Sequence, residues 1–389
     1  MAEGQHIRVM QFLNSTVRSG AEEVALELAR GLDPKRFRSF LVCPPELMEA
    51  FGDDSHARHI ETYALSLQAP WQAAVALRFV GYLRSQKIDV VNAHMIRAAL
   101  VAVPLARMAG VPVVIQTCHG REAWRKGWLK GQYWIDRIIA RWADATVAVS
   151  EATGTYLVVE KRLSPHKVRV IRNGRSLAGF SPSASRQESL RNELRIGPKD
   201  QVVGVFGRLE EQKGHRFLIS GMPNVLAQLP ATKVILVGEG ALRHELESYV
   251  SSLNVSEAVR FTGYRPDWKE LMALSDVIVL PSLYEGMPLV PIEAAAMARP
   301  VVATSVDGTC EVVIDGVTGL LIPPAEPEPL ARAIIDLLTN PAKCRRLGQS
   351  AQTRAHEQFS LHRQIEETAS LYEQLLSKTE RLLQPTTVA

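Results

Sequence analysis

The chain has 389 residues, of which 46% are hydrophobic, 22% charged and 6% aromatic, and its formal net charge is +4. This length exceeds the roughly 250–300 residues at which a single hydrophobic core stops growing, so we expect two domains. The composition excludes disordered, collagen-like and repeat-biased chains, and no stretch approaches the roughly 18 consecutive apolar residues of a membrane span.

The N-terminal residues do not resemble a secretory leader, and the cysteines are scattered. The opening MAEGQHIRVMQFLN lacks a basic region, an apolar region and a small-residue cleavage site. Cys43, Cys118, Cys310 and Cys344 form no Cys-x-x-Cys pair. We therefore expect a cytoplasmic protein with reduced cysteines, with neither a disulfide framework nor a zinc site.

The first half of the chain alternates short apolar runs with amphipathic stretches. The stretches at 21–31 and 98–109 have apolar residues three and four apart, which predicts helices. Strand and helix repeated in this way favour a parallel sheet covered on both faces. The apolar runs predict strands at 7–13, 40–43, 89–93, 112–117, 146–149 and 168–171.

A polar segment follows, and the pattern then restarts. Helices are predicted at 215–229, 242–253 and 364–383, and strands at 202–206, 233–237, 259–262, 277–280, 301–304 and 319–322. Two doubly wound α/β domains facing a cleft would bind ligands outside the carboxyl ends of their strands. The predicted divisions are an N-terminal domain at 1–175, a connection at 176–200, a C-terminal domain at 201–362, and a helix and tail at 363–389.

The strongest local pattern is the segment PSLYEGMPLVPIEAAAMARPVVAT, in which a turn-rich loop leads from a strand into a helix. The backbone N–H groups of Met287, Leu289 and Val290 would have no partner within that helix and, with the helix dipole, predict an anion site. Glu285 before this site and Glu293 two turns into the helix suit hydroxyl groups, which a nucleotide sugar presents on both sides of its diphosphate. The alternative is an ordinary helix-start acid and an exposed helix residue.

A second loop, GRLEEQKGHRFLI, also follows a predicted strand of the same domain. Gly207 allows a tight exit from the strand, and Arg208 and Lys213 then lie close to the carboxyl end of that strand. Two cations there would neutralise a diphosphate and stabilise it as it leaves. The alternative is that both side chains are solvated loop charges.

Weaker patterns lie elsewhere. Gly20, in a small-residue loop before a helix, would let the backbone approach a phosphate. His94 and His119 end predicted strands, where a histidine can hydrogen-bond a substrate. The stretch GEGALR matches only half of a dinucleotide fingerprint, and the sequence contains no Gly-x-x-x-x-Gly-Lys-Ser/Thr loop, no His-Glu-x-x-His and no clustered metal ligands.

Positive charge is concentrated in one part of the chain. Residues 1–180 carry a net charge of +8, of which +7 lies within 121–175, and the remainder of the chain carries −4. Tryptophans and basic residues on one helix over 121–142 would suit an anionic lipid surface. Equally, the tryptophans could be core and the charges solvated. These side chains are Trp124, Trp128, Trp134, Trp142, Arg121, Arg125, Lys126, Lys130, Arg137 and Arg141.

These motifs together resemble those of the retaining glycosyltransferases of family 4, also called glycosyl transferases group 1, over nearly the whole chain. The specific motifs are the Gly-Arg…Lys-Gly stretch at 207–214 and the Glu-x7-Glu spacing from Glu285 to Glu293. The chain departs from the family's Asn-Gly-x-Asp with Asn-Gly-Arg-Ser at 173–176. The looser matches are SGAE at 19–22, NAH at 92–94, TCHG at 117–120, VSEAT at 149–153 and VIRNG at 170–174.

The resemblance implies the GT-B architecture, two facing Rossmann-like domains with the C-terminal helix returning to the N-terminal domain. It implies that Arg208 and Lys213 bind the donor diphosphate, that Glu293 holds the ribose hydroxyls, and that Glu285 and His119 contact the donor sugar. No metal and no cofactor are implied. The further donor-binding residues that it implies are Gly20, Gly207, Thr262, Gly263, Tyr264, Arg265, Gly286, Met287, Leu289 and Val290.

The function that the resemblance implies is a hexosyl- or N-acetylhexosaminyltransferase that uses a nucleotide-diphosphate sugar, with uridine favoured over guanosine. The acceptor would be lipid-linked or a saccharide of the bacterial cell envelope, and the enzyme would be peripheral at the inner face of the membrane. The alternatives are a GT-B-like epimerase and a non-catalytic sugar- or nucleotide-binding module. We expect no nucleic-acid partner, since no RNA- or DNA-binding motif accompanies the basic residues.

Overall fold

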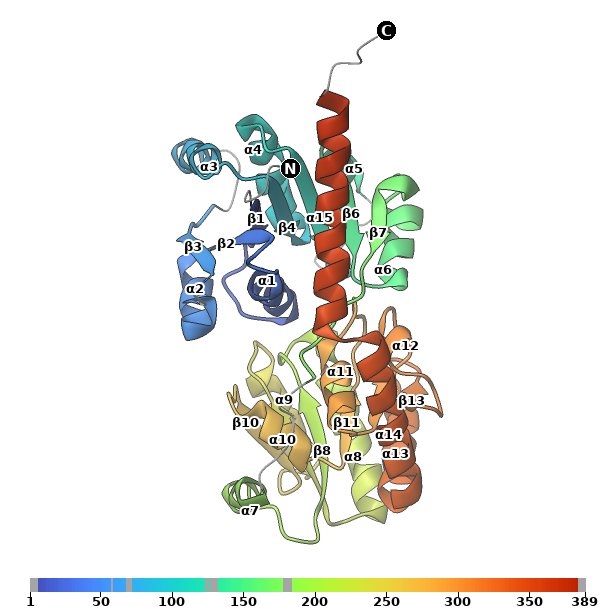
Figure 1. Ribbon diagram of the computed structural model, residues 1–389. Helices are drawn as coiled ribbons and strands as arrows, with labels where there is room; N and C mark the ends of the chain where they lie inside the picture. Colours follow the sequence, from blue (N-terminus) through green and yellow to red (C-terminus); the bar gives the residue numbers. More distant parts are fainter. Residues whose placement is uncertain are drawn as a thin grey trace. The chain divides into compact units, whose positions relative to one another are not determined.

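The computed structural model describes residues 6–56, 59–67, 72–122, 125, 132–177 and 184–383. The chain forms two compact units (Figure 1). The first unit contains Met1–Asn173 and Leu361–Ala389, and the second contains Gly174–Ser360. Each unit is built on one parallel sheet, which confirms the predicted α/β fold class. No helix in the described ranges is long and apolar enough to cross a membrane.

The sheet of the first unit has the strand order β3-β2-β1-β4-β5-β6-β7. All of these strands except β3 were predicted, with small shifts at their ends. No residue of β3 is buried, and it lies at the edge of the sheet, so it lacks the continuous apolar run of a central strand. The strands are β1 (Ile7–Phe12), β2 (Phe37–Cys43), β3 (Ile60–Ala64), β4 (Val90–His94), β5 (Val113–Cys118), β6 (Ala145–Ala148) and β7 (Val168–Val170).

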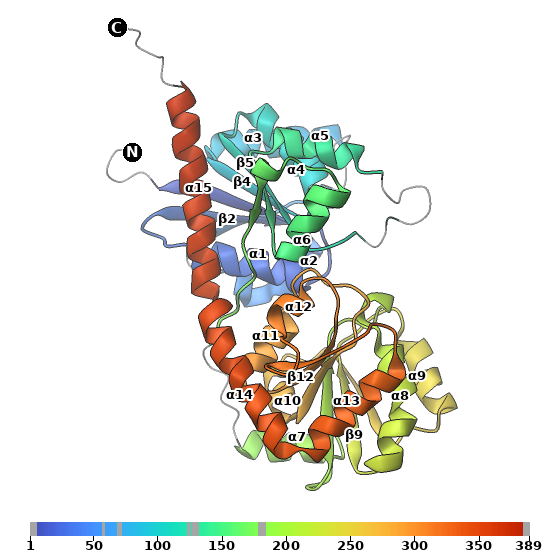
Figure 2. The same ribbon diagram turned by 90° about the vertical axis from the view of Figure 1, so that its right-hand side faces the viewer.

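Helices cover both faces of this sheet because alternate strand residues point to opposite sides. Met10 and Phe12 share a core with α3 and α4, whereas Leu13 packs with α1 and α2. In Figure 2, α3, α4 and α5 lie together, and α1 and α15 lie on the other side of the sheet. The helices are α1 (Gly20–Gly31), α2 (Pro45–Phe51), α3 (Ala73–Ser85), α4 (Met95–Ala109), α5 (Trp134–Trp142), α6 (Glu151–Thr155) and α15 (Leu361–Leu383).

The last helix, α15, belongs to the first unit, as the resemblance implied. It contacts α1 and β5. Arg36, just before β2, donates to the carboxylates of Glu366 and Glu373 on α15, at 3.2 and 2.8 Å. The apolar face of α15 therefore packs on the sheet of the first unit, whose strands come from the N-terminal part of the chain.

The prediction of one helix over 121–142 is wrong for the residues that the structure describes. The helix α5 begins only at Trp134, and Arg121, Glu122 and Arg125 lie outside any helix. Trp124, Lys126, Trp128 and Lys130 lie outside the described residues. The periodicity of the tryptophans and basic residues therefore does not reflect one continuous helical face.

The sheet of the second unit has the order β10-β9-β8-β11-β12-β13, and all six strands were predicted. Residues of α8, α9 and α13 share one core with the sheet, and residues of α10 and α11 share another. Its strands are β8 (Gln201–Phe206), β9 (Thr232–Val237), β10 (Val259–Gly263), β11 (Val277–Leu280), β12 (Val301–Thr304) and β13 (Gly319–Ile322). Its helices are α7 (Ala184–Glu193), α8 (His215–Gln228), α9 (Arg243–Ser252), α10 (Trp268–Leu274), α11 (Leu289–Ala296), α12 (Thr309–Val312), α13 (Pro327–Thr339) and α14 (Pro341–Gln358).

In each unit the direction of the strand order reverses once. The reversal lies between β1 and β4 in the first unit and between β8 and β11 in the second. Loops that leave two such strands diverge to opposite faces of the sheet and open a crevice at the strands' carboxyl ends, where doubly wound folds bind ligands. The two specific sequence motifs follow β8 and β11, so the fold brings them to this point.

Candidate active site

The loops that follow β8 and β11 are joined through their backbones. The Leu283 N–H donates to the Gln212 carbonyl at 2.8 Å, and the Gln212 side chain donates to the Tyr284 carbonyl at 3.0 Å. Gly214 has a φ of +65°, and a Cβ there would lie 2.0 Å from the Pro281 carbonyl oxygen. Only glycine allows this close approach, so the Lys-Gly of the first motif holds the two loops together.

Lys213 and Glu285 form an ion pair across the two loops. Lys213 Nζ donates to Glu285 Oε1 at 2.6 Å, and Ser282 Oγ donates to the same oxygen at 2.7 Å. The backbone N–H of Glu285 donates to Asp307 Oδ2 at 3.1 Å. The Glu285 side chain is only 6% exposed and that of Lys213 19%, so neither is an ordinary solvated charge.

Arg208 lies in the same loop as Lys213 but is more exposed. Its Nη1 donates to Glu210 Oε1 at 2.6 Å, and its side chain is 41% exposed. Gly207 before it has a φ of +152°, and Gly238 packs against the Gly207 carbonyl. The sharp exit that was predicted at Gly207 is therefore present, and it leaves the guanidinium of Arg208 accessible to solvent.

The helix α11 begins at Leu289, as predicted, immediately after the second loop. Pro288 precedes it, and no side chain of the described residues caps its first turn. Gly286 and Met287 are buried, whereas Leu289 and Val290 are partly exposed. Backbone N–H groups at this end, together with the helix dipole, suit an anion.

Glu293, inside α11, is buried and paired. Its Oε1 accepts a hydrogen bond from Arg175 Nε at 2.7 Å, and its side chain is 8% exposed. The interpretation of Glu293 as an exposed helix residue is therefore wrong. Arg175 was noted in the sequence only as part of a departure from the family motif. No local pattern links two residues that are 118 positions apart.

The predicted base-binding segment, Thr262 to Arg265, lies at the carboxyl end of β10, which β9 separates from β8. Thr262 Oγ1 donates to the Leu236 carbonyl at 3.2 Å, and Tyr264 is 68% exposed. Arg265 donates to Asp267 at 2.7 Å and also pairs with Glu193. The hydrogen bond from Arg265 holds the pKa of the Asp267 carboxyl well below its usual range, and Arg265 is engaged both by its own loop and by α7.

Two predicted site residues belong to the first unit. Gly20 is the exposed first residue of α1, preceded by Ser19, whose hydroxyl donates to the Glu22 carboxylate. His119 follows β5, and its Nε2 lies 2.9 Å from Nδ1 of His94. Burial lowers the pKa of His119 to about 4. Burial, and secondly the proximity of His119, lower the pKa of His94 well below its usual value. Both imidazoles are therefore neutral at pH 7.

A buried ion cluster in the first unit was not foreseen from the sequence. Lys161 Nζ donates to Glu122 at 2.6 Å and to Asp136 at 2.7 Å, and Arg125 Nη2 donates to Asp136 at 2.7 Å. The Tyr156 hydroxyl donates to Glu122 at 2.7 Å. The Arg125 side chain is 8% exposed, so its assignment to a lipid-facing surface is wrong. Lone charges spaced irregularly in the sequence do not reveal which of them will be buried together.

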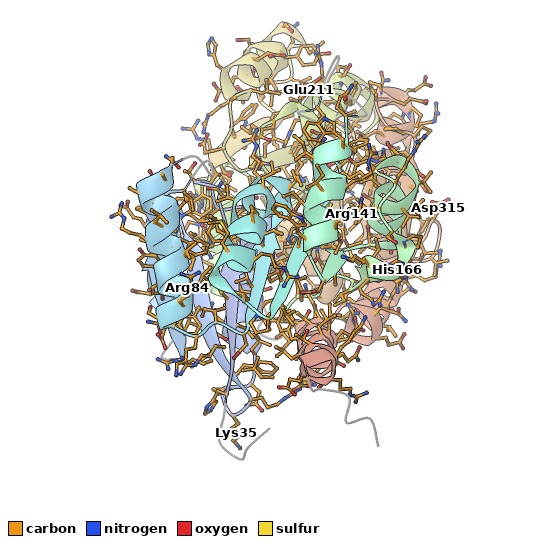
Figure 3. All side chains as sticks on the ribbon, turned by 90° about the horizontal axis from the view of Figure 1, so that it is seen from above. Lys35, Arg84, Arg141, His166, Glu211 and Asp315 are labelled. Atoms are coloured by element: carbon orange, nitrogen blue, oxygen red, sulfur yellow. The ribbon has the colours of Figure 1, made fainter. Side chains whose placement is uncertain are left out.

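The outer face of α5 is apolar and exposed. Trp134, Ile135, Ile138 and Trp142 are 54%, 39%, 42% and 50% exposed. Arg141, on the same helix, is also exposed (Figure 3). The interpretation of these two tryptophans as core residues is therefore wrong. Apolar side chains of this size that are gathered on one helix face commonly mark an interaction surface.

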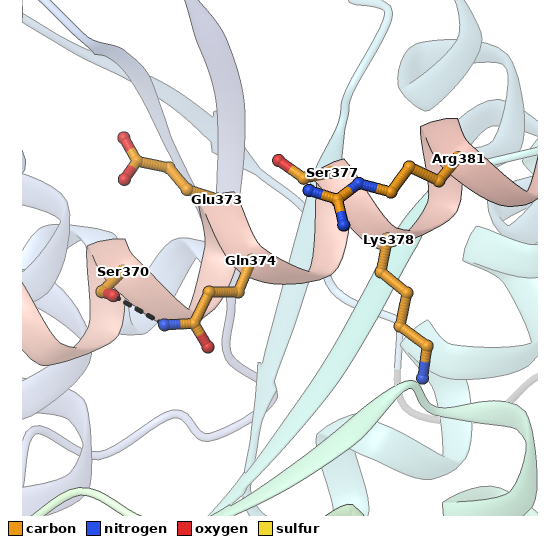
Figure 4. A pocket seen from close by; sticks show the side chains of 6 residues that line it. All are labelled: Ser370, Glu373, Gln374, Ser377, Lys378 and Arg381. Carbon is orange, nitrogen blue, oxygen red and sulfur yellow. Dashed lines mark hydrogen bonds between the residues drawn. The ribbon is translucent and has the colours of Figure 1, made fainter.

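A separate hollow of about 520 Å³ lies along α15, lined by the side chains in Figure 4. It contains none of the predicted donor-binding residues. Ser370 and Gln374 hydrogen-bond to each other there at 3.0 Å, and Glu373 pairs with Arg36. Within the described part of the chain, no group of three or more His, Cys, Asp or Glu side chains is arranged to hold a metal ion.

Two family models match the chain. The model described as glycosyl transferases group 1 matches residues 186–354, and the model described as glycosyltransferase family 4 matches residues 18–178. These ranges lie in the parts of the chain that carry the two loop motifs and the first sheet.

Curated relatives and solved structures agree with these models. The chain is 32% identical to a Mycobacterium tuberculosis glycogen synthase over 83% of the chain and 76% of that protein. It is 24% identical to the Escherichia coli UDP-Gal:alpha-D-GlcNAc-diphosphoundecaprenol alpha-1,3-galactosyltransferase over 94% and 95%. The structure of Anabaena HepE in complex with UDP-glucose matches with a TM-score of 0.83 and 25% identity over 94% of this chain and 100% of that one.

The residues brought together at the carboxyl ends of β8 and β11, the two parallel-sheet units and these matches lead to one assignment. The chain belongs to glycosyltransferase family 4, the glycosyl transferases group 1, and is a nucleotide-sugar glycosyltransferase with the GT-B fold.

Proposed function

We propose that the protein transfers a hexosyl or N-acetylhexosaminyl group from a UDP-sugar, with retention of anomeric configuration and without a metal ion, to a lipid-linked saccharide of the bacterial cell envelope. The observation that carries this proposal is the Lys213–Glu285 pair at the carboxyl ends of β8 and β11, beside the first turn of α11. The ammonium of Lys213 and the carboxylate of Glu285 lie in adjoining loops, and the N-terminus of α11 follows the second of these loops. A sugar diphosphate presents the matching groups, namely anionic oxygens and hydroxyls.

We assign the cationic side chains to the diphosphate of the donor and the carboxylates to its sugar and ribose hydroxyls. Arg208, Lys213 and the N-terminus of α11 bind the diphosphate, and the backbone of 286–290 lines its path. Glu285 and Glu293 accept hydrogen bonds from hydroxyls of the sugar and the ribose. The segment 262–265 lies against the base. From the first unit, Gly20 approaches the phosphates and His119 contacts the sugar, as the resemblance implies.

Retention follows from attack on the face from which the diphosphate departs. The bond from the anomeric carbon to the phosphate oxygen breaks as the acceptor oxygen bonds to that same face, and the acceptor proton passes to the departing phosphate oxygen. The charge that develops on the diphosphate is stabilised by Lys213 and Arg208, which removes the need for a bound metal ion. Two cationic side chains and a helix N-terminus supply positive potential at the diphosphate, as a bound metal ion would.

The name of the E. coli relative supports a lipid-linked acceptor, because its acceptor is an undecaprenyl diphosphate saccharide. The exposed face of α5 supports contact with a membrane that carries such an acceptor. Tryptophans and isoleucines would enter the interface, and Arg137 and Arg141 would meet anionic headgroups. This surface replaces the longer one that was expected over 121–142.

Sedimentation with phosphatidylglycerol vesicles tests the membrane contact. Binding of the full chain at low salt should fall when Trp134 and Trp142 are both replaced by Ser. The control is Leu77→Ser, which removes a still more exposed apolar side chain from α3. Equal binding by the double variant and the control would contradict the assignment of this surface.

A transfer assay tests the activity itself. The purified protein is incubated with UDP-glucose, UDP-galactose, UDP-N-acetylglucosamine or GDP-mannose, polyprenyl-diphosphate N-acetylglucosamine and EDTA. We expect transfer from one UDP-sugar, and an α-linked product as judged by the coupling constant of its anomeric proton. A β-linked product would contradict retention, and loss of activity in EDTA would contradict metal independence. Conversion of the UDP-sugar without an acceptor would favour an epimerase, and binding without turnover would favour a binding module.

A further inference from the structure

A chain of hydrogen-bonded side chains crosses one face of the first unit's sheet and ends at His119. The hydroxyl of Tyr372, on α15, accepts hydrogen bonds from Gln11 Nε2 at 3.2 Å and Asn92 Nδ2 at 3.1 Å. Asn92 Nδ2 also donates to Gln11 Oε1 at 3.1 Å, and that oxygen lies 2.9 Å from His94 Nε2. His94 Nδ1 lies 2.9 Å from His119 Nε2. The network therefore runs without a break from the C-terminal helix to a proposed donor-binding residue.

Strand register explains why these side chains meet. Gln11 and Asn92 are partners in the adjacent parallel strands β1 and β4, and His94 follows Asn92 by two residues on the same face. Their neighbours Phe12 and Ala93 point to the apolar core on the opposite face. Gln11, Asn92, His94 and Tyr372 are each at most 1% exposed. Polar groups buried to this degree need hydrogen-bond partners, and here each finds them in the others.

In the structure both amide NH₂ groups are directed at the Tyr372 hydroxyl oxygen, and the contact between the two amides joins a donor to an acceptor. Gln11 and Asn92 contact each other, so turning over only one amide would set two donors or two acceptors face to face. Turning over both would direct two carbonyl oxygens at the hydroxyl, which can donate to one of them. In the observed orientation both amide NH₂ groups donate to the hydroxyl oxygen, and Thr117 Oγ1 donates to Asn92 Oδ1 at 2.8 Å. Gln11 therefore presents a carbonyl oxygen to His94.

This orientation determines where the imidazole protons lie. A carbonyl oxygen only accepts, so His94 Nε2 must carry a proton and donate it to Gln11 Oε1. In a neutral His94 the other nitrogen, Nδ1, is then an acceptor. His119 Nε2 must therefore carry its own proton and donate to His94. The burial that lowers the pKa of both histidines keeps each ring neutral at pH 7. It follows that His119 Nδ1 carries a lone pair.

We infer that Tyr372, Gln11, Asn92 and His94 are positioning residues that fix the tautomer of His119, so that its Nδ1 accepts a hydrogen bond from a hydroxyl of the donor sugar. None of the described residues bonds to Nδ1 of His119. The inference deepens the proposed function and rests on it for the role of His119. It gives the C-terminal helix a part in sugar recognition, because Tyr372 determines which nitrogen of His119 is protonated.

Nitrogen-15 spectroscopy of the histidine side chains tests the tautomer directly. In the full chain, the ring signals of His119, assigned by their loss in His119→Gln, should show a protonated Nε2 and an unprotonated Nδ1 at pH 7. Tyr372→Phe removes the hydroxyl that orients both amides and should give a mixture of the two tautomers. Thr368→Val is the matched control. It removes another buried hydroxyl of α15, one that donates to the Gln364 carbonyl within the helix, and it should leave the tautomer unchanged.

Kinetics test the consequence. Tyr372→Phe should lower kcat/KM for the UDP-sugar by about 10-fold, the equivalent of about 1.4 kcal/mol, and leave the Kd for UDP unchanged. Thr368→Val should match the wild type. A wild-type His119 protonated on Nδ1, or a Tyr372→Phe variant with full kcat/KM, would overturn the inference. If the wild type transferred no sugar, the proposed function would fail, whereas the nitrogen signals would still report the tautomer.

Discussion

Nε of Arg175 donates to Oε1 of Glu293 at 2.7 Å, and the backbone N–H of Arg175 donates to the Phe359 carbonyl at 2.9 Å. The chain passes between its two units after Asn173 and after Ser360. Arg175 therefore lies next to both crossings and holds a buried carboxylate of α11. In the proposed function that carboxylate binds the ribose of the donor, so the orientation of Glu293 depends on a residue at the unit boundary.

Replacing Arg175 with Met should destabilise the protein by about 2 kcal/mol, because a charged hydrogen bond is lost and the Glu293 carboxylate stays buried. Urea unfolding measures the change. Arg332→Met breaks an Arg–Glu pair whose side chains are 63% and 72% exposed, and it should cost well under about 1 kcal/mol. In the double variant Arg175→Met, Glu293→Gln, part of the lost stability should return. Strictly additive effects of the two substitutions would argue against a direct interaction.

Lys213→Met should lower kcat by roughly 100- to 1,000-fold, since it removes a cation that stabilises the departing diphosphate. Its stability should also fall, by about 1–2 kcal/mol, because the buried Glu285 carboxylate loses its cation and keeps the hydrogen bond from Ser282. Steady-state kinetics and thermal melting measure the two effects separately. The matched control is Lys233→Met, on β9, where Nζ donates only to the Glu257 carbonyl among the described residues. Full activity of Lys213→Met would remove Lys213 from the donor site.

Glu285→Gln should retain nucleotide binding and lose transfer. The substitution keeps the shape of the side chain and removes the charge that strengthens its hydrogen bonds to sugar hydroxyls, so kcat should fall by about 100-fold. Calorimetric titration should give the same Kd for UDP as the wild type. A rise in the Kd for UDP with an unchanged kcat would place Glu285 at the nucleotide instead of the sugar.

His215, the first residue of α8, should make the protein sensitive to acid. It is 2% exposed, and neither ring nitrogen has a hydrogen-bond partner among the described residues. Burial and, secondly, the nearby Lys213 lower its pKa from 6.5 to about 4. Between these two values the unfolded chain binds a proton that the folded chain does not. Stability should therefore fall by up to about 1.4 kcal/mol per unit as pH falls through this window.

His215→Leu should remove that contribution and cost little at pH 7, since the ring makes no hydrogen bond that would be lost. Chemical unfolding at a series of pH values from 7 to 4 compares the slopes. His244→Gln, at an exposed position of α9, should retain the wild-type slope. Parallel curves for wild type and His215→Leu would mean that His215 does not control the acid sensitivity.

Local patterns were enough to locate most elements and the two loops that follow β8 and β11. The central strands β8 and β11 of the second unit are buried, mainly apolar runs, and α11 begins at the residue after Pro288, where the loop signals predicted its start. A parallel strand that is buried on both faces is apolar along its length, so it can be recognised in the sequence as an apolar run. The edge strand β3 was not predicted, because its side chains are only partly buried and its sequence therefore lacks a continuous apolar run. The basic, tryptophan-rich segment was misread because charge and aromatic content do not indicate burial.

The amino-acid sequence by itself determined the α/β class, the two sheets and the places of the loops after β8 and β11, because periodicity and turn residues act over a few neighbouring positions. Only the tertiary structure decided which side chains meet. Tyr372 and Gln11 are 361 positions apart, Arg175 and Glu293 are 118 apart, and Lys213 and Glu285 are 72 apart. These contacts depend on strand order and register, which bring distant segments side by side and which no local pattern specifies.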